Sequence, residues 1–292
     1  MKKARIDAVL AERGLFPSRS AAAGAVRAGE VRVGTDGPVA LRPSQLVEPE
    51  ADFVLQARSR FVSRGGIKLE NALEALRIDP ADRDCLDVGA STGGFTDCML
   101  QRGAARVAAV DVAYGQIDAR LRKDTRVIVI ERLNARALGP ADLPFLASLA
   151  TIDVSFISLT KMLPAVASCL VPGGEVLAMV KPQFELGRER VGRGVVRDPA
   201  DRQEAVLKVA LAARETGLPV RGIASSGLPG PKGNRETFVW CGGEGPELED
   251  LEGAIAAADA ASLAAEEAGP DDDGAEPAGY DAVGRDPQGP QS

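Results

Sequence analysis

Four charged residues stand where an α/β sheet would present a ligand. Asp153 closes the apolar run LATID, Lys181 closes EVLAMVK, Lys68 lies at the start of a helix, and Glu236 opens a late strand. A lysine at the end of an apolar strand is unfavourable unless an acid pairs with it. Two amines and two carboxylates in one site could orient a hydroxyl group and take its proton. The alternative is that Lys181 and Glu236 reach solvent at the sheet edge.

The sequence contains no histidine, which limits its acid–base chemistry. Triads built on imidazole, histidine bases and histidine-ligated metals are therefore excluded. A lysine base needs a pKa near 7 to 8 instead of roughly 10.4. We expect burial and the like charge of Lys68 to lower the pKa of Lys181, while Asp153 and Glu236 orient the two amines.

The cysteines and the apolar pattern bear on metals and membranes. Cys85, Cys98, Cys169 and Cys241 form no Cys-x-x-Cys pair, and no histidine completes a zinc site. We therefore expect no metal and four buried free thiols. No apolar stretch approaches the roughly 18 residues that span a bilayer, so we expect a soluble, cytoplasmic protein without a membrane partner.

The segment DVGASTGG, residues 87 to 94, is a glycine-rich loop after an apolar run. It lacks the Gly-Lys-Ser/Thr of a phosphate-binding P-loop and the G-x-G-x-x-G of a dinucleotide site. Asp87 precedes the first glycine and Asp111 closes the next apolar run. Two such acids fit the ammonium group and ribose diol of S-adenosylmethionine, whereas a loop kept small for helix packing is the alternative. The candidate cofactor-binding residues are Asp87, Gly89, Ala90, Ser91, Thr92, Gly93, Asp111 and Asn134.

These residues need a scaffold that brings several strand ends together. From residue 61, the apolar runs CLDVG, RVAAVDV, RVIVIE, LATIDVSF and GGEVLAMVKP alternate with helix-like segments such as KLENALEAL. Short runs rich in Val, Ile and Ala, separated by helices, are typical of parallel strands buried on both faces. The pattern predicts an α/β fold, a doubly wound Rossmann-like sheet that binds ligands at the carboxyl ends of its strands.

The first residues predict a small α+β module. Ile6, Val9 and Leu10 have helical spacing, GLFPS breaks the helix, and a second helix runs from about Arg19 to Arg27 before Gly29. VRV and VAL are expected to form short strands around a TDG turn.

Several motifs of this module resemble the S4 RNA-binding domain. They are Arg5 to Asp7, Gly14 to Leu15, Ser18 to Arg19, Gly29 to Val33 and Pro43 to Ser44. The resemblance implies that Arg5 and Arg19 contact RNA phosphates. Without the resemblance, the simpler interpretation is an ordinary solvent-exposed face that contains Arg5, Arg19, Arg27 and Arg32.

The net charge of −7 combines two unlike parts of the chain. Residues 1–243 contain 34 Lys and Arg against 28 Asp and Glu, whereas residues 244–292 contain one base and 14 acids. A basic body suits an RNA partner. The acidic end is low in large apolar residues, which predicts disorder from about residue 245 apart from a helical turn near 250 to 267.

Longer motifs resemble the TlyA family of ribosomal RNA 2′-O-methyltransferases, FtsJ-like enzymes historically labelled haemolysins. They are FVSRGGIKLENAL, DVGASTGGFTD, AVDVAYGQ, DVSFISL, VKPQFELGRERVG and GPKGN. The resemblance covers residues 2 to about 241. It implies that Lys68, Asp153, Lys181 and Glu236 form the catalytic Lys-Asp-Lys-Glu tetrad and that S-adenosylmethionine is the cofactor. It also implies methylation of cytidine 2′-hydroxyls in ribosomal RNA within ribosomal subunits, small, large or both.

The expected domains follow from composition and resemblance together. They are an S4-like RNA-binding domain at 1–58, a linker at 59–63, an FtsJ-like class I methyltransferase domain at 64–243 and an acidic disordered tail at 244–292. Arg64 at the domain junction and Arg188 in the arginine-rich loop after Lys181 are further candidate RNA-binding residues. Phe156 could stack on a flipped-out target base or pack in the core.

Other functions stay open from the sequence. Cytosine C5 methylation needs a cysteine nucleophile, and amino-group methylation favours a Pro-Pro-aromatic motif where this chain has DVSF. Ribose oxygen is therefore preferred over a base. A non-catalytic S4-type RNA-binding or ribosome-assembly protein is the main alternative. A membrane-active haemolysin is disfavoured because the chain lacks a strong cationic amphipathic helix.

Overall fold

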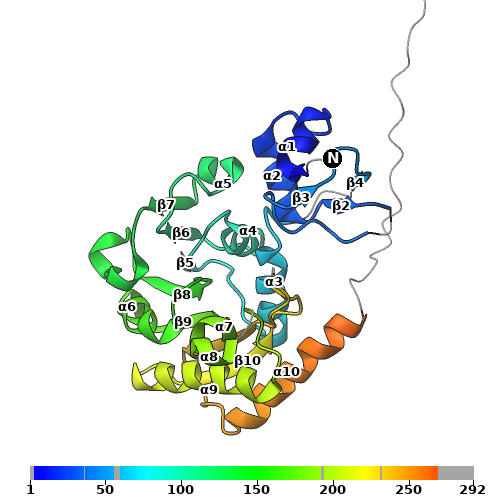
Figure 1. Ribbon diagram of the computed structural model, residues 1–292. Helices are drawn as coiled ribbons and strands as arrows, with labels where there is room; N and C mark the ends of the chain where they lie inside the picture. The colour runs from blue at the N-terminus through cyan, green and yellow to red at the C-terminus, as the bar shows by residue number, and fades with distance from the viewer. Residues whose placement is uncertain (1–2, 36, 56–59, 192–193, 231, 269–292) are drawn as a thin grey trace, which may run out of the picture.

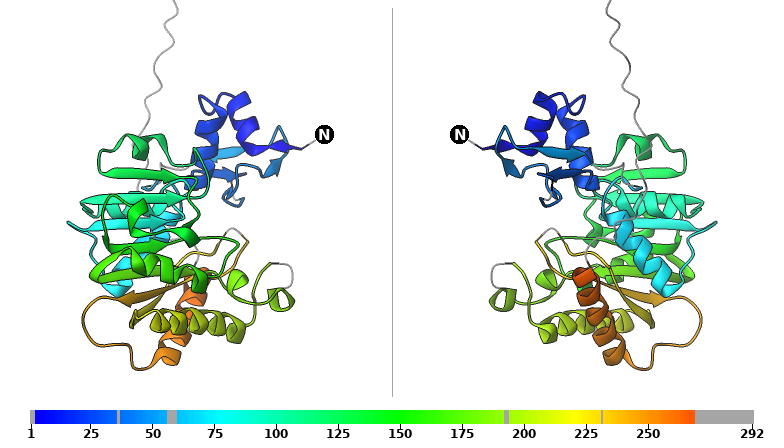
Figure 2. Two further views of the ribbon diagram at one scale, coloured as in Figure 1. Left: turned by 90° about the vertical axis from the view of Figure 1, so that its left-hand side faces the viewer. Right: turned by 90° about the vertical axis from the view of Figure 1, so that its right-hand side faces the viewer.

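A computed structural model of the chain describes residues 3–35, 37–55, 60–191, 194–230 and 232–268 (Figure 1). A small amino-terminal domain precedes a larger domain built on a seven-stranded sheet. Figure 2 shows the small domain to one side of the larger one. Within the described ranges, no helix combines the length and apolar character needed to cross a membrane.

The amino-terminal domain contains the two predicted helices, α1 (Ile6–Glu12) and α2 (Arg19–Ala28). Ser18 caps α2 by accepting a hydrogen bond from the Ala21 N–H at 3.2 Å, and Gly29 ends it with a φ of 81°. β1 (Ala4–Arg5) pairs with β3 (Leu46–Val47), and β2 (Val31–Val33) pairs with β4 (Phe53–Leu55). The predicted strand at VAL is reduced to an isolated bridge between Arg32 and Val39.

The large sheet confirms the predicted Rossmann-like fold. Its strands are β5 (Asp84–Val88), β6 (Arg106–Asp111), β7 (Val127–Glu131), β8 (Ala147–Ile152), β9 (Leu170–Val180), β10 (Val220–Ser225) and β11 (Thr237–Gly242). The order is β10-β11-β9-β8-β5-β6-β7, with the last two strands in the chain antiparallel to their neighbours. β5 pairs in parallel with both β6 and β8, so the chain switches direction beside β5, where such sheets bind ligands.

Helices cover both faces of this sheet. Along β6, Ala108 and Val110 face one hydrophobic layer, and Val107 and Ala109 face the other. The first layer packs against α6 (Leu163–Ser168) and α9 (Pro199–Glu215), the second against α3 (Gly65–Leu76), α4 (Gly94–Gln101) and α5 (Ala119–Lys123). Short helices complete the connections: η1 (Ala135–Ala137), η2 (Pro140–Asp142), η3 (Leu159–Lys161), α7 (Pro182–Glu185) and α8 (Arg188–Val191). The four predicted free cysteines are all buried.

An 18-residue helix, α10 (Leu251–Ala268), lies where the sequence predicted an acidic disordered tail with a helical turn near 250 to 267. Leu251 and Ile255 pack into the layer that contains α9. Arg202 of α9 donates to both carboxylate oxygens of Asp259 at 2.6 and 2.7 Å, and both side chains are buried. The expected helical turn is therefore a full helix fixed to the domain, because a few apolar residues on one face and one buried ion pair hold it. Residues 269–292 lie outside the described part.

The two domains meet at the start of α3. The Arg64 N–H donates to the Arg27 carbonyl at 3.4 Å, and the stem of Arg64 lies against Gly29. Of the predicted linker 59–63, Phe61 and Val62 are buried, and the Val62 N–H donates to Asp97 at 2.8 Å. The end of α2 is thus joined to the helix that carries Lys68.

Candidate active site

The carboxyl ends of β5, β8 and β9 lie at one edge of the sheet because these strands are parallel. Asp153 follows β8, and Lys181 follows β9. β11 runs antiparallel to β9, and its first residue, Thr237, pairs with Val180. This register places Glu236, the residue before β11, beside Lys181.

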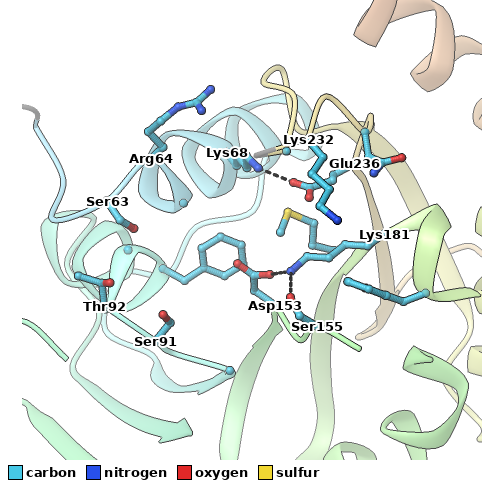
Figure 3. A pocket seen from close by; sticks show the side chains of 18 of the residues that line it. Ser63, Arg64, Lys68, Ser91, Thr92, Asp153, Ser155, Lys181, Lys232 and Glu236 are labelled. Atoms are coloured by element: carbon cyan, nitrogen blue, oxygen red, sulfur yellow. Dashed lines mark hydrogen bonds and ion pairs between the residues drawn. The ribbon is translucent and has the colours of Figure 1, made fainter. Parts of the chain in front are cut away.

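Lys68, Asp153, Lys181 and Glu236 line one pocket and form two ion pairs (Figure 3). Lys68 Nζ donates to Glu236 Oε2, and both side chains are buried. Lys181 Nζ pairs with Asp153 Oδ1 and donates to Ser155 Oγ at 3.1 Å. The Lys181 side chain is 11% exposed and that of Glu236 is 2% exposed, so the alternative in which they reach solvent is wrong.

The protonation of Lys181 differs from the expectation. Burial lowers its pKa and is the largest single effect, but the charges of Asp153 and Glu236 and the hydrogen bond to Asp153 together raise the pKa above its ordinary value. The prediction of a lowered pKa for Lys181 is therefore wrong for the protein without ligand. The amine is held as an ammonium group by the carboxylates around it.

The glycine loop packs closely against Asp153, the residue after β8, at Gly89. Gly89 has a φ of 87°, and a Cβ there would lie 2.3 Å from the carbonyl oxygen of Asp153. Ala90, Ser91 and Thr92 line the same pocket as the four charged residues. Gly93 does not line it: a Cβ at this position would lie 2.3 Å from Leu121 Cδ1, so its small size serves helix packing.

A second pocket adjoins the first and contains the other candidate cofactor residues. Asp111 and Asn134 line it, and Gly89, Ser91, Asp153, Ser155 and Phe156 line both pockets. The Asp111 carboxylate accepts hydrogen bonds from the Ser91 and Ala113 N–H groups, each at 2.7 Å. A carboxylate has about four lone-pair sites, so Asp111 retains capacity for ligand hydroxyls. The Asn134 side chain accepts from the Arg136 N–H at 3.1 Å.

Asp87 is fully buried at the end of β5. Its carboxylate accepts hydrogen bonds from Thr96 N at 2.9 Å, Thr96 Oγ1 at 2.6 Å and Thr151 Oγ1 at 3.3 Å. Burial raises the pKa of Asp87 to about 7, and the charge of Asp153 adds to the rise while the bonds from Thr96 and Thr151 oppose it. In this structure Asp87 therefore fixes the first turn of α4 beneath the glycine loop.

Asp87 is expected to make stability depend on pH. Its pKa is about 7 when folded and roughly 3.9 when unfolded, so its contribution to the free energy of unfolding falls as pH rises from about 4 to about 7. Asp87→Asn removes this titration, and the variant gains up to about 4 kcal/mol relative to the parent across that range. Urea unfolding at several pH values measures the difference, with the exposed Asp52→Asn as control. Parallel curves for parent and D87N would contradict the assignment.

The predicted RNA-binding arginines of the small domain share one acid. Arg5 donates to Asp7 through Nε at 3.0 Å and through Nη2 at 2.7 Å, and Arg19 Nε lies 3.3 Å from Asp7 Oδ1. Asp7 is buried, and these arginines hold its pKa below the usual range. Both arginine side chains stay exposed while they share this acid, so the two guanidinium groups lie together at the surface of the small domain.

The other predicted RNA contacts lie around the pocket. Arg64 lines it, and burial lowers its pKa while the charge of Glu236 opposes that change. Phe156 is 90% exposed at a φ of 66°, with its ring 5.1 Å from that of Phe184. Core packing of Phe156 is therefore wrong. The side chain of Arg188 lies outside the described part of the structure.

Sequence reasoning missed three residues of the site. Ser155 binds Lys181, and the exposed Lys232 lines the pocket. Asn234 is buried, accepts from the Val196 N–H at 2.9 Å and donates to the Gly194 carbonyl at 2.7 Å. It thereby ties the arginine-rich loop to the segment before Glu236. The GPKGN motif was the available sequence signal for Lys232 and Asn234, and the position two residues after Asp153 was the signal for Ser155.

Comparisons with known proteins identify relatives of both domains. The model of the FtsJ-like methyltransferase family matches residues 61–243, and that of the S4 domain matches residues 4–53. The chain is 48% identical over 242 residues to a Mycobacterium tuberculosis protein named 16S/23S rRNA (cytidine-2'-O)-methyltransferase TlyA, covering 82% of this chain and 90% of the relative. Identity to YqxC of Bacillus subtilis, named as a candidate rRNA methyltransferase, is 42% over 256 residues, covering 86% of this chain and 90% of that relative.

A solved structure extends the similarity to three dimensions. It comes from Streptococcus thermophilus, is described as a candidate hemolysin, and is 40% identical with a TM-score of 0.71. The superposition covers 91% of this chain and 99% of that one. The sequence matches and the fold agree, and the chain belongs to the TlyA family of FtsJ-like methyltransferases that carry an amino-terminal S4 domain.

Proposed function

We propose that the protein transfers a methyl group from S-adenosylmethionine to the ribose 2′-hydroxyl of cytidine in ribosomal RNA. The observation that carries the proposal is the pair of lysine–carboxylate contacts in one pocket beside the glycine loop. The name of the Mycobacterium tuberculosis relative supports cytidine and the 2′-oxygen. The S4 domain supports an RNA substrate.

The residues present fit the proposed cofactor. Gly89 leaves no room for a side chain where the loop meets Asp153, and Asp111 faces the adjoining pocket with unused acceptor capacity. In the proposal Asp111 and Asn134 hold the nucleoside, and Ala90, Ser91 and Thr92 border the methionine part. When bound, this cofactor supplies a methyl group on positively charged sulfur, which a nucleophilic oxygen takes up with release of the neutral thioether.

Lys181 is proposed to accept the proton of the 2′-hydroxyl through its Nζ atom as the oxygen becomes a nucleophile. Asp153 and Ser155 fix the position of that amine by direct contact. Lys68 and Glu236 form the facing pair, and the charge of Glu236 acts on Lys181. Because the pKa of Lys181 is raised in the free protein, the neutral amine that can act as a base is a minor form near pH 7.

The raised pKa predicts how activity depends on pH. We expect kcat/KM for methyl transfer to rise about tenfold per pH unit between about pH 6.5 and 9 without a plateau, because kcat/KM reports the essential groups of the free enzyme. Initial rates with limiting S-adenosylmethionine measure the profile, and binding of the cofactor at each pH is the control. A plateau below about pH 8 would mean that the pKa of Lys181 is lowered instead.

The RNA is proposed to reach the site across the small domain. Arg5 and Arg19 form its basic surface, Arg64 continues it to the pocket, and the exposed Phe156 stacks on the flipped target base. Arg188 is proposed as a further RNA contact from its place in the sequence alone. The proposed partner is ribosomal RNA within small or large ribosomal subunits, in the cytoplasm.

Radiolabelled S-adenosylmethionine tests the proposal directly. The protein is incubated with intact small subunits, large subunits, or naked ribosomal RNA, and the label is mapped to nucleotide and atom. Label on a cytidine 2′-oxygen is expected. Label on a base, or no label on any of these RNAs, would overturn the proposal, the latter in favour of a non-catalytic S4-type protein.

A further inference from the structure

The pocket contains three cationic side chains besides the two lysines that form its ion pairs. Arg27, Arg64 and Lys232 line it in addition to Lys68 and Lys181. Its acids are Asp153 and Glu236, both paired with lysines, and Asp87, which is held by threonines. Across the residues that the structure describes, Arg27, Arg64 and Lys232 make no ion pair and no side-chain hydrogen bond.

These three cations come from three separate segments. Arg27 lies in the last turn of α2 in the small domain, Arg64 precedes α3, and Lys232 lies in the loop before β11. Arg27 and Arg64 adjoin, because the Arg64 N–H donates to the Arg27 carbonyl. Lys232 lies on the other side of the Lys68–Glu236 pair from Arg64 (Figure 3), next to Gly194.

The exposure of these side chains indicates what kind of anion they bind. Arg27 and Lys232 are exposed, whereas Lys68 and Glu236 are buried. The cations therefore stand where a large ligand enters the pocket, and the site proposed for the nucleoside lies in the adjoining pocket with Asp111. A target ribose inside the first pocket carries a phosphate on each side of it. Lysine and arginine are the side chains that bind RNA phosphates.

We propose that Arg27, Arg64 and Lys232 form a phosphate clamp that holds the RNA backbone on both sides of the target ribose. The inference rests on the proposed function and adds a subsite to it. Through Arg27, the S4 domain contributes a residue to the pocket itself, in addition to the basic surface formed by Arg5 and Arg19. The clamp makes the reactive ribose, and not only the RNA as a whole, a joint ligand of both domains.

The test uses the full chain with Arg27→Ala, Lys232→Ala and the double variant. Arg27→Lys keeps the charge, and the exposed Lys161→Ala, away from the pocket, is the matched control. Binding to ribosomal subunits is measured against KCl concentration. Each alanine variant is expected to reduce the slope of log K against log salt by about 0.7 to 1, and the double variant by about twice that. Arg27→Lys and Lys161→Ala are expected to retain the parent slope.

Two further readouts separate the clamp from its alternatives. Affinity for S-adenosylmethionine, measured by calorimetry, is expected to stay within about twofold, while kcat/KM for the subunit falls about tenfold per variant. Unchanged salt slopes, or a loss of cofactor affinity, would overturn the clamp, the second result because the cations then bind the cofactor's carboxylate. A parent protein that binds subunits but transfers no methyl group would overturn the proposed function, and the salt slopes would still decide on the clamp.

Discussion

Replacing Lys181 with arginine is expected to lower kcat for methyl transfer by about a thousandfold or more, although the positive charge is kept. Arginine preserves a cation for Asp153 but cannot lose its proton in the range where proteins are folded. Lys181→Met removes both the charge and the base and is expected to be equally inactive. Single-turnover transfer of labelled methyl to ribosomal subunits measures both variants.

Controls separate a lost base from a damaged pocket. Affinities for S-adenosylmethionine and for ribosomal subunits are expected to stay near the parent values in Lys181→Arg, and Lys161→Ala is expected to keep full activity. If Lys181→Arg retains more than about a tenth of the parent rate, the amine acts as a fixed charge and not as a proton acceptor. If Lys181→Met also retains more than about a tenth of the parent rate, Lys181 takes no part in methyl transfer.

Removing the carboxylate of Asp259 is expected to lower the free energy of unfolding by about 3 to 5 kcal/mol. The change leaves the buried Arg202 guanidinium of α9 without its bidentate partner. Leaving one charge of a buried pair uncompensated costs far more than losing an exposed ion pair. Urea unfolding followed by circular dichroism measures the effect of Asp259→Ala.

Two comparisons make this result specific to the buried pair. Glu252→Ala changes an exposed residue of the same helix and is expected to shift stability by less than about 0.5 kcal/mol. Arg202→Met combined with Asp259→Leu removes both charges and is expected to recover most of the loss. A small effect of Asp259→Ala would mean that α10 contributes little to the folded domain.

The fold was largely predictable because its central strands are continuous apolar runs. β5, β6, β7, β8 and β9 all coincide with predicted runs. β10 escaped notice because Arg221, Gly222 and Ser225 interrupt its apolar pattern, although Val220, Gly222 and Ala224 are buried against neighbours. α10 was predicted only as a helical turn in a disordered tail, for a related reason: its fixed position depends on Arg202, 57 residues earlier, which no local composition reveals.

The site was predictable in its membership more than in its electrostatics. Strand ends and the family resemblance selected the two lysines and two acids that the structure brings together. The direction of the pKa shift of Lys181 was not predictable. It depends on whether the attraction of Asp153 and Glu236 outweighs the effect of burying the amine. Asn234 and Lys232 belong to the GPKGN motif, but their contacts with the loop at Gly194 join segments distant in the sequence, which the motif alone does not reveal.

The Lys68–Glu236 contact joins residues 168 positions apart. Lys68 belongs to the first helix of the large domain, and Glu236 directly precedes the last strand, which inserts between β9 and β10. During synthesis from the amino terminus, the glycine loop and Lys181 are therefore made well before Glu236 is available to pair with Lys68. The four charged residues can therefore meet in one pocket only after the last strand has been synthesised and inserted into the sheet.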